Sequence, residues 1–167
     1  DITGDKLPDL AITTGTQFWI LSGYTGATIQ TATLMEGTAW APRDIINIAD
    51  IDLDNTPDLL WRSHDSGTIY IRHGKPGTVP GSVDINSLKT AAASREGVDT
   101  SYGTGWTTTN ITAVIGIPDV NGDKIPDLWV RYGADGTMKV YHPSTTNTGP
   151  AVKTVLSTNW TGIKSFG

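Results

Sequence analysis

The sequence predicts an all-β protein built from three repeats of about four short strands each. Gly and Pro are frequent (19 and 9 of 167 residues), whereas charged residues make up only 17% of the chain. This composition favours short strands and turns over long helices. Short alternating or apolar runs are separated by turn signals, and no segment shows helical periodicity over a full helix length. One acidic stretch also recurs three times along the chain.

The acidic stretch defines the repeats. It is "DITGDKLPDL" at 1–10, "DIDLDNTPDL" at 50–59 and "DVNGDKIPDL" at 119–128. The corresponding repeats cover 1–49, 50–118 and 119–167 within a single segment, 1–167. The middle repeat is longer because of an insertion at about 75–105, which we expect to be a long surface loop with a short helix near 86–94.

Each acidic stretch leads into a predicted hairpin. The first predicted strand of the hairpin is "LAITT", "LLWRS" or "LWVRY" in the three repeats, and the second strand is "FWIL", "TIYIR" or "TMKVY". A turn separates the two strands, and in the second and third repeats it contains "DSG" and "ADG". Gly accepts the positive φ that such a turn requires. A tryptophan in a Thr- and Gly-rich setting follows (Trp40, Trp106 and Trp160), and the apolar runs "DIINIAD" and "NITAVIG" come after the first two. Four short strands in about 50 residues are typical of a β-propeller blade or a similar sheet repeat.

The acidic stretches are candidate cation sites. Oxygen-bearing side chains occupy positions 1, 3, 5 and 9, and position 7 offers a backbone carbonyl. This order is similar to the start of an EF-hand loop, and Ca²⁺ takes about 6–8 oxygen ligands. Pro at position 8 starts an extended segment, so no helix follows. The alternative is a set of Asx-turns that cap backbone amides without metal; the threefold recurrence and the mutual repulsion of the carboxylates favour metal, with calcium ahead of magnesium.

These stretches resemble the loops of FG-GAP/VCBS repeats, the blades of integrin-α-like β-propellers. "SFG" at 165–167 also resembles the Phe-Gly that precedes such a loop. The resemblance implies a secreted, bacterial type of propeller with one Ca²⁺ in each loop. The implied ligands are Asp1, Thr3, Asp5, Leu7 and Asp9; Asp50, Asp52, Asp54, Thr56 and Asp58; and Asp119, Asn121, Asp123, Ile125 and Asp127, with position 7 contributing its carbonyl.

The chain departs from the family pattern at position 6, which is usually Gly and here is Lys6, Asn55 or Lys124. Thr3 is also a poorer ligand than Asp or Asn. We therefore rank the 50–58 loop first for calcium, the 119–127 loop second and the 1–9 loop third.

Three repeats are fewer than the four to eight blades of a closed propeller, so we expect the chain to be part of a larger one. The implied function is a calcium-binding scaffold or interaction module of an extracellular, bacterial protein. Its partners would be the remaining blades, on another chain or fragment, and a protein such as a secreted enzyme or protease. The alternatives are a glycan-binding propeller, or an accessory domain of a secreted hydrolase whose catalytic part lies outside this chain.

The sequence argues against binding to nucleic acid, against a membrane span and against catalysis. The net charge of −5 argues against nucleic acid, and no apolar run is long enough to span a membrane. Cysteine is absent and no G-x-S-x-G motif occurs, so we expect no enzyme. The three histidines, His64, His73 and His142, are expected at strand ends on the surface. Arg62 and Arg131 match between repeats and are assigned to the repeat pattern, and the tryptophans are assigned to packing between blades, with sugar stacking as the alternative.

Overall fold

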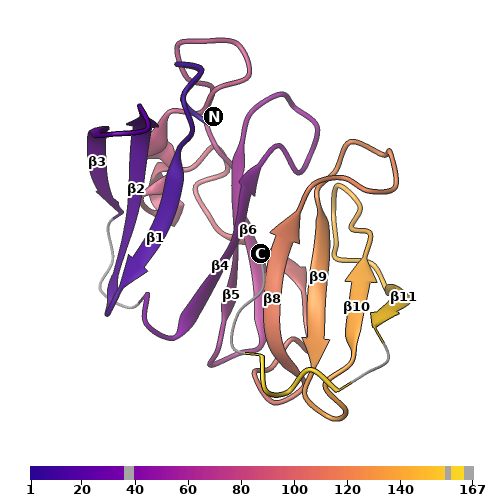
Figure 1. Cartoon of the computed structure of the whole chain (residues 1–167). Helices are drawn as coiled ribbons and strands as arrows, with labels where there is room; N and C mark the ends of the chain where they lie inside the picture. The colour runs from indigo at the N-terminus through magenta and orange to yellow at the C-terminus, as the bar shows by residue number, and fades with distance from the viewer. Residues whose placement is uncertain (36–39, 157–158, 164–167) are drawn as a thin grey trace.

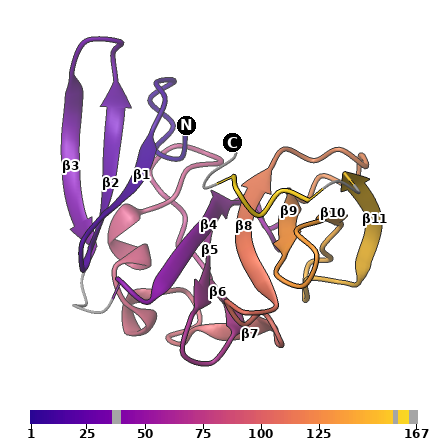
Figure 2. The same cartoon turned by 60° about the horizontal axis from the view of Figure 1, so that its bottom comes forward.

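The computed structural model shows three antiparallel sheets side by side (Figures 1 and 2). The structure describes the chain except residues 36–39, 157–158 and 164–167, so the "SFG" at 165–167 lies outside the described residues. The first sheet contains β1 (Leu10–Thr14), β2 (Gln17–Tyr24) and β3 (Ile29–Met35). The second contains β4 (Arg43–Ala49), β5 (Asp58–Ser63), β6 (Thr68–Arg72) and β7 (Thr100–Gly103). The third contains β8 (Ile111–Ile117), β9 (Asp127–Tyr132), β10 (Met138–Tyr141) and β11 (Ala151–Leu156).

The predicted all-β class is confirmed, and the strands follow the predicted runs closely. The described residues form three open sheets that do not close into a ring. They also include no helix long and apolar enough to cross a bilayer.

The sheets are offset from the sequence repeats by one strand. β4 precedes the 50–58 loop and pairs with β5, so Ala49 lies opposite Asp58. β8 precedes the 119–127 loop and pairs with β9, so Ile117 lies opposite Asp127. The second and third acidic loops therefore join the edge strand of a sheet to its inner neighbour, whereas residues 1–9 precede β1, an edge strand of the first sheet.

The core fills the spaces between neighbouring sheets. Every residue of β5 except the last is buried, because this strand packs on both faces. Leu59 and Trp61 contact the cluster shared with the first sheet, whereas Leu60 belongs to the cluster shared with the third. Trp40 and Trp106 are buried in the same two clusters, which confirms the packing role assigned to these tryptophans.

Arg62 and Arg131 occupy the same place in successive sheets, as the repeat pattern predicts. Arg62 Nη1 donates to the carbonyls of Trp106 (3.4 Å) and Ile111 (2.6 Å). Arg131 Nη1 donates to the carbonyl of Trp160 at 3.1 Å. Each arginine thus holds the tryptophan segment that follows its own hairpin, which is a structural role.

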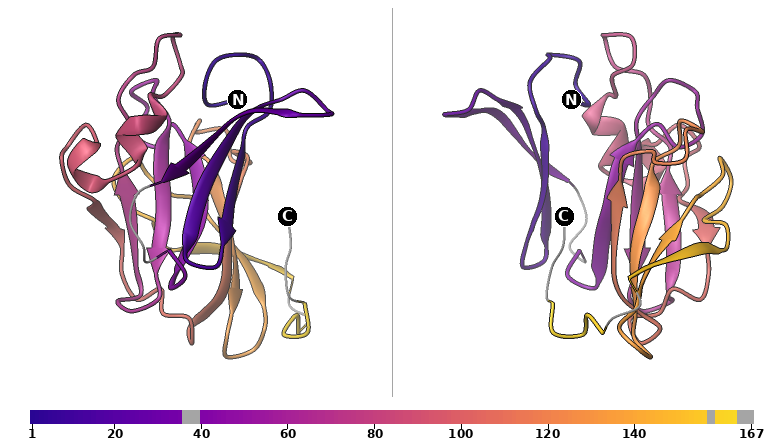
Figure 3. Two further views of the ribbon diagram at one scale, coloured as in Figure 1. Left: turned by 90° about the vertical axis from the view of Figure 1, so that its left-hand side faces the viewer. Right: turned by 45° about the vertical axis from the view of Figure 1, so that its right-hand side comes forward.

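Part of the 75–105 insertion is packed against the sheets, so the expectation of a surface loop is wrong for that part, although many of its other residues are exposed. It contains two short 3-10 helices, η1 (Ile85–Leu88) and η2 (Ala91–Ala93), where a short helix was expected, and it ends in β7. Val83 and Leu88 are buried in the core between the first two sheets. The helical turns lie beside the second sheet (Figures 2 and 3).

Candidate functional site

The three acidic loops lie at the same end of the sheets, opposite the Gly-containing hairpin turns (Figure 1). The 50–58 loop joins β4 to β5, the 119–127 loop joins β8 to β9, and residues 1–9 precede β1. The sheet arrangement therefore brings the three sequence stretches into equivalent positions.

The position-9 carboxylate fastens each loop to its sheet. Asp58 is fully buried; its Oδ2 accepts the Ile51 N–H at 3.2 Å and its Oδ1 accepts the Gly74 N–H at 3.0 Å. Gly74 follows β6, so this one side chain ties the loop's entry to the far end of the hairpin. A carboxylate that accepts two buried amides is a strong structural contact.

The same contacts recur in the other two loops. Asp9 accepts the N–H groups of Ile2 (2.8 Å) and Gly23 (2.9 Å), and Asp127 accepts the N–H of Val120 (2.7 Å). In the third sheet the residue equivalent to Gly74 is Pro143, which has no N–H to donate. His142 Nδ1 lies 2.8 Å from Asp127 Oδ1 and takes the place of that amide.

The carboxylates at position 1 cap amides within each loop. Asp50 accepts the N–H groups of Asp54 (3.0 Å) and Asn55 (2.9 Å), and burial raises the pKa of its carboxyl group. Asp119 accepts those of Lys124 (2.8 Å) and Gly122 (2.7 Å), and these bonds lower the pKa of the Asp119 carboxyl group. The Asx-turn arrangement considered from the sequence is therefore present, and it leaves lone pairs on the same oxygens for a cation.

The position-7 residues, predicted to offer their carbonyls, and Thr3 are the remaining residues of the predicted ligand set. The amides of Leu7, Thr56 and Ile125 each donate to the position-5 carboxylate, at 2.8 Å in every loop. The hydroxyl of Thr3 is buried and has no hydrogen-bond partner among the residues that the structure describes. In the third loop, Asn121 Nδ2 lies 2.9 Å from Asp123 Oδ2.

Position 6 has a positive φ in all three loops: 68° at Lys6, 70° at Asn55 and 74° at Lys124. This is the left-handed region that glycine adopts without strain and most other residues adopt at a cost. Leu53, at position 4 of the second loop, also has a φ of 63°. The backbone therefore has the shape for which a position-6 glycine is suited.

Grouped metal-ligating side chains are concentrated in the second loop. In the described part of the chain, Asp50, Asp52 and Asp54 form one set, and Asp52, Asp58 and His73 form another; within each set the ligand atoms lie within 4.8 Å of one another. The first set offers only oxygen and suits a hard cation such as Ca²⁺ or Mg²⁺. The second includes a nitrogen ligand, which suits transition metals better.

His73 is a site residue that the sequence did not reveal. Its Nδ1 lies 3.1 Å from Asp52 Oδ2 and 3.5 Å from Asp58 Oδ1, and its side chain is only 12% exposed. The contacts with Asp58 and then Asp52 raise the pKa of the imidazole. Surface placement is therefore wrong for His73, which lies directly after β6; His142, directly after β10, and His64, at the β5–β6 turn, are partly exposed. The sequence signal that could have pointed to His73 is that His73 in "RHG" and His142 in "YHP" occupy equivalent positions in two repeats.

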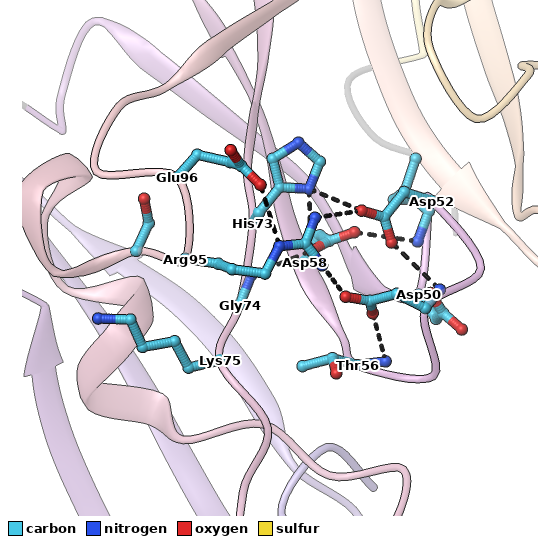
Figure 4. A network of polar contacts seen from close by, with 12 residues as sticks. Asp50, Asp52, Thr56, Asp58, His73, Gly74, Lys75, Arg95 and Glu96 are labelled. Atoms are coloured by element: carbon cyan, nitrogen blue, oxygen red, sulfur yellow. Dashed lines mark hydrogen bonds and ion pairs between the residues drawn. The ribbon is translucent and has the colours of Figure 1, made fainter.

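Arg95, from the insertion, is the second residue that the sequence did not reveal (Figure 4). Its Nη2 lies 2.5 Å from Asp52 Oδ2, its Nη1 contacts Asp54 Oδ2, and its Nε donates to Glu96 Oε1 at 3.1 Å. Its hydrogen bond with Asp52 is the main contact that raises the pKa of its guanidinium. Arg95 is 43 positions from Asp52, and no local pattern connects them.

No protein-family model, no curated protein and no solved structure matches this chain. The interpretation of the loops therefore depends on their own residues and geometry.

Proposed function

We propose that the chain is a segment of a calcium-binding β-propeller of the FG-GAP/VCBS kind, acting as a scaffold or interaction module of an extracellular protein. The main support is the recurrence of one loop architecture at the same end of three successive sheets. In each loop the position-9 carboxylate accepts the position-2 amide, and position 6 has a positive φ. Unrelated acidic turns would not be expected to repeat these details.

The outer faces support further blades beyond the described sheets. In the second sheet, Leu59 and Leu60 are buried on opposite faces of β5. The residue equivalent to Leu59 in the first sheet, Leu10, is 44% exposed, and Ile12 beside it is 37% exposed. In the third sheet, Trp129 is equivalent to Leu60 and is 36% exposed. Apolar side chains of the first and third sheets thus lie on the faces turned away from the second sheet. Additional sheets from the same protein or another chain would cover them there.

Calcium would have a structural role in this proposal. In the third loop, Asp119, Asn121, Asp123 and Asp127 with the carbonyl of Ile125 would hold it. A bound cation would supply positive charge to the clustered carboxylates and stabilise the folded state by an amount that grows with the logarithm of its concentration above the dissociation constant. The protein's own contribution is the preformed loop, held by its amide bonds.

The test compares thermal unfolding in calcium and in chelator. Calcium at 100 times its dissociation constant adds about 2.7 kcal/mol per site, which corresponds to roughly 5–10 °C for a chain of this size. The double variant Asp119→Asn, Asp123→Asn should lose the third loop's share of that shift. Asp135→Asn, in an exposed turn outside the loops, is the matched control. Absence of any calcium-dependent shift in the unmodified chain would exclude the metal function.

The protein-binding part of the proposal is best tested at the insertion's exposed residues. Shortening 75–105 would remove Val83 and Leu88 from the core, so loss of binding would not be informative. Val79 and Val98 are instead exposed large apolar residues of the insertion. Changing both to Ser should weaken binding to a secreted protease, measured by surface plasmon resonance, with an unchanged melting temperature. Unchanged binding would remove the insertion from the interface.

A glycan-binding function is favoured by one cleft. It has a volume of about 560 Å³ and is lined in part by Trp106, Tyr132, Tyr141, Asn110 and Thr148. Aromatic faces beside hydroxyl and amide groups suit a sugar ring. Tyr132 is the partly exposed ring of the set. Tyr132→Ala should abolish tryptophan fluorescence changes on addition of oligosaccharides; if the unmodified protein shows no such change, the glycan alternative is excluded.

A further inference from the structure

The second acidic loop differs from the other two because a side chain of the insertion lies among its carboxylates. The Arg95 guanidinium bridges Asp52 and Asp54, which are positions 3 and 5 of the loop. Figure 4 shows Arg95 beside Asp52. These are two of the three carboxylates in the oxygen-only set that a hard cation would use. A guanidinium offers several N–H donors in a fixed plane and so satisfies two carboxylates at once.

The backbone holds Arg95 at this place. Its N–H donates to the carbonyl of His73 at 2.9 Å, directly after β6. The neighbouring Ser94 is buried; its hydroxyl donates to the Ala91 carbonyl (2.7 Å) and accepts the Gly97 N–H (3.1 Å). The side chain therefore extends from a fixed segment toward the loop.

Arg95 and a divalent cation cannot share these carboxylates. A metal bound to Asp50, Asp52 and Asp54 would lie beside the guanidinium, because those ligand atoms lie within 4.8 Å of one another. Two adjacent cations repel, and Asp52 and Asp54 would have to exchange one partner for the other. The arrangement observed is the one in which the loop uses the chain's own cation.

The other loops offer no such substitute. In the part of the chain that the structure describes, no Lys or Arg forms an ion pair with Asp5, Asp119 or Asp123. We propose that Arg95 is the resident cation of the 50–58 loop, replacing calcium there and fastening the 75–105 insertion to the loop. This reverses the ranking from sequence, which placed the 50–58 loop first for calcium.

The inference depends on the proposed calcium function only for the contrast with the third loop. The test is Arg95→Gln, with Glu96→Gln as the matched control, because Glu96 contacts Arg95 but belongs to no acidic loop. Calcium titration calorimetry should show one additional site in Arg95→Gln, at least tenfold tighter than any binding by the 50–58 loop of the unmodified chain. Adding Asp52→Asn to Arg95→Gln should remove that site again. In chelator, Arg95→Gln should melt below the unmodified protein and recover in calcium, whereas Glu96→Gln should behave like the unmodified protein.

Two results would overturn the inference: binding of calcium by both proteins with equal stoichiometry and affinity, or equal melting temperatures of the two proteins in chelator. If neither protein binds calcium, the proposed function fails, and melting in chelator alone decides the role of Arg95. If Arg95→Gln does not fold, Asp52→Asn with Asp54→Asn in the otherwise unmodified chain replaces it. That variant should lose the same stability in calcium and in chelator; a loss seen only in calcium would contradict the resident-cation role.

Discussion

The position-9 carboxylate and the two amides that it accepts form a clamp between the loop and its sheet. The substitution Asp58→Ala, which removes this clamp in the second sheet, gives the sharpest stability prediction. Asp58 is fully buried and accepts the amides of Ile51 and Gly74 at 3.2 and 3.0 Å. Both amides belong to buried residues, so water cannot replace the lost acceptor without opening the loop. We expect the loop's entry and the end of β6 to lose their connection.

The magnitude follows from the two hydrogen bonds. A hydrogen bond to a charged group contributes about 1.5–3 kcal/mol, so losing both should lower the free energy of unfolding by roughly 3–6 kcal/mol. For a chain of this size, each kcal/mol corresponds to about 2–4 °C in the melting temperature. The expected fall is therefore on the order of 10–20 °C. Asp58→Asn keeps one acceptor oxygen and should lose about half as much.

The assay is thermal unfolding monitored by circular dichroism in chelator, so that metal makes no contribution. Asp84→Ala is the control, because Asp84 is an exposed carboxylate that caps one amide of a short 3-10 helix; it should cost only about 1 kcal/mol. If Asp58→Ala melts like the control in chelator and is destabilised only in calcium, Asp58 acts as a metal ligand and the clamp argument is wrong.

Three further predictions follow from single features. The pKa of His73 is raised from 6.5 in the folded state, so its contribution to stability is fully present below pH 6.5 and is lost as pH rises through the folded-state pKa. Unfolding measured in chelator from pH 5.5 to 9 should show this loss, and His73→Gln should remove that part of the pH dependence; an identical profile would contradict it. Lys124→Gly relieves a positive φ of 74° and should raise stability by up to about 1 kcal/mol, measured by urea unfolding, whereas Lys139→Gly within β10 should lower it. Trp129→Gln should reduce self-association, measured by sedimentation velocity, with little change in melting temperature, whereas Trp61→Gln should destabilise the core; unchanged association would argue against an uncovered sheet face at Trp129.

The strands and the loop backbone were predictable because their determinants are local. The run "LAITT" corresponds to β1 residue for residue, and Gly67 and Gly136 have the positive φ expected at the hairpin turns. Position 6 was singled out because the resembled family usually has Gly there, and the positive φ at Lys124 gives the physical reason for that preference. In each case a few adjacent residues decide the geometry.

The offset of the sheets and the packing of the insertion were not predictable in this way. A repeat can be divided at any point in its cycle, and the most recognisable stretch need not begin a sheet. Val83 and Leu88 are isolated apolar residues in a segment rich in Gly, Ser and Pro, without the period of a strand or helix. The contact of Arg95 with Asp52 spans 43 positions and depends on that packing.

The geometry separates two tasks within the acidic stretch. Pro57 fixes the backbone before Asp58, and Asp58 opens β5 with its carboxylate directed at amides of the sheet and loop. The carboxylates of Asp50, Asp52 and Asp54 instead accept amides within the loop and keep their charge nearer the surface. Because the clamp and the caps are hydrogen bonds within the chain, they hold the loops in shape, and the proposed cation would bind to an existing arrangement. Chelator should therefore lower the melting temperature while leaving the far-ultraviolet circular dichroism spectrum at 20 °C unchanged within about 10%; loss of strand signal on chelation would show that the cation is needed to form the sheets.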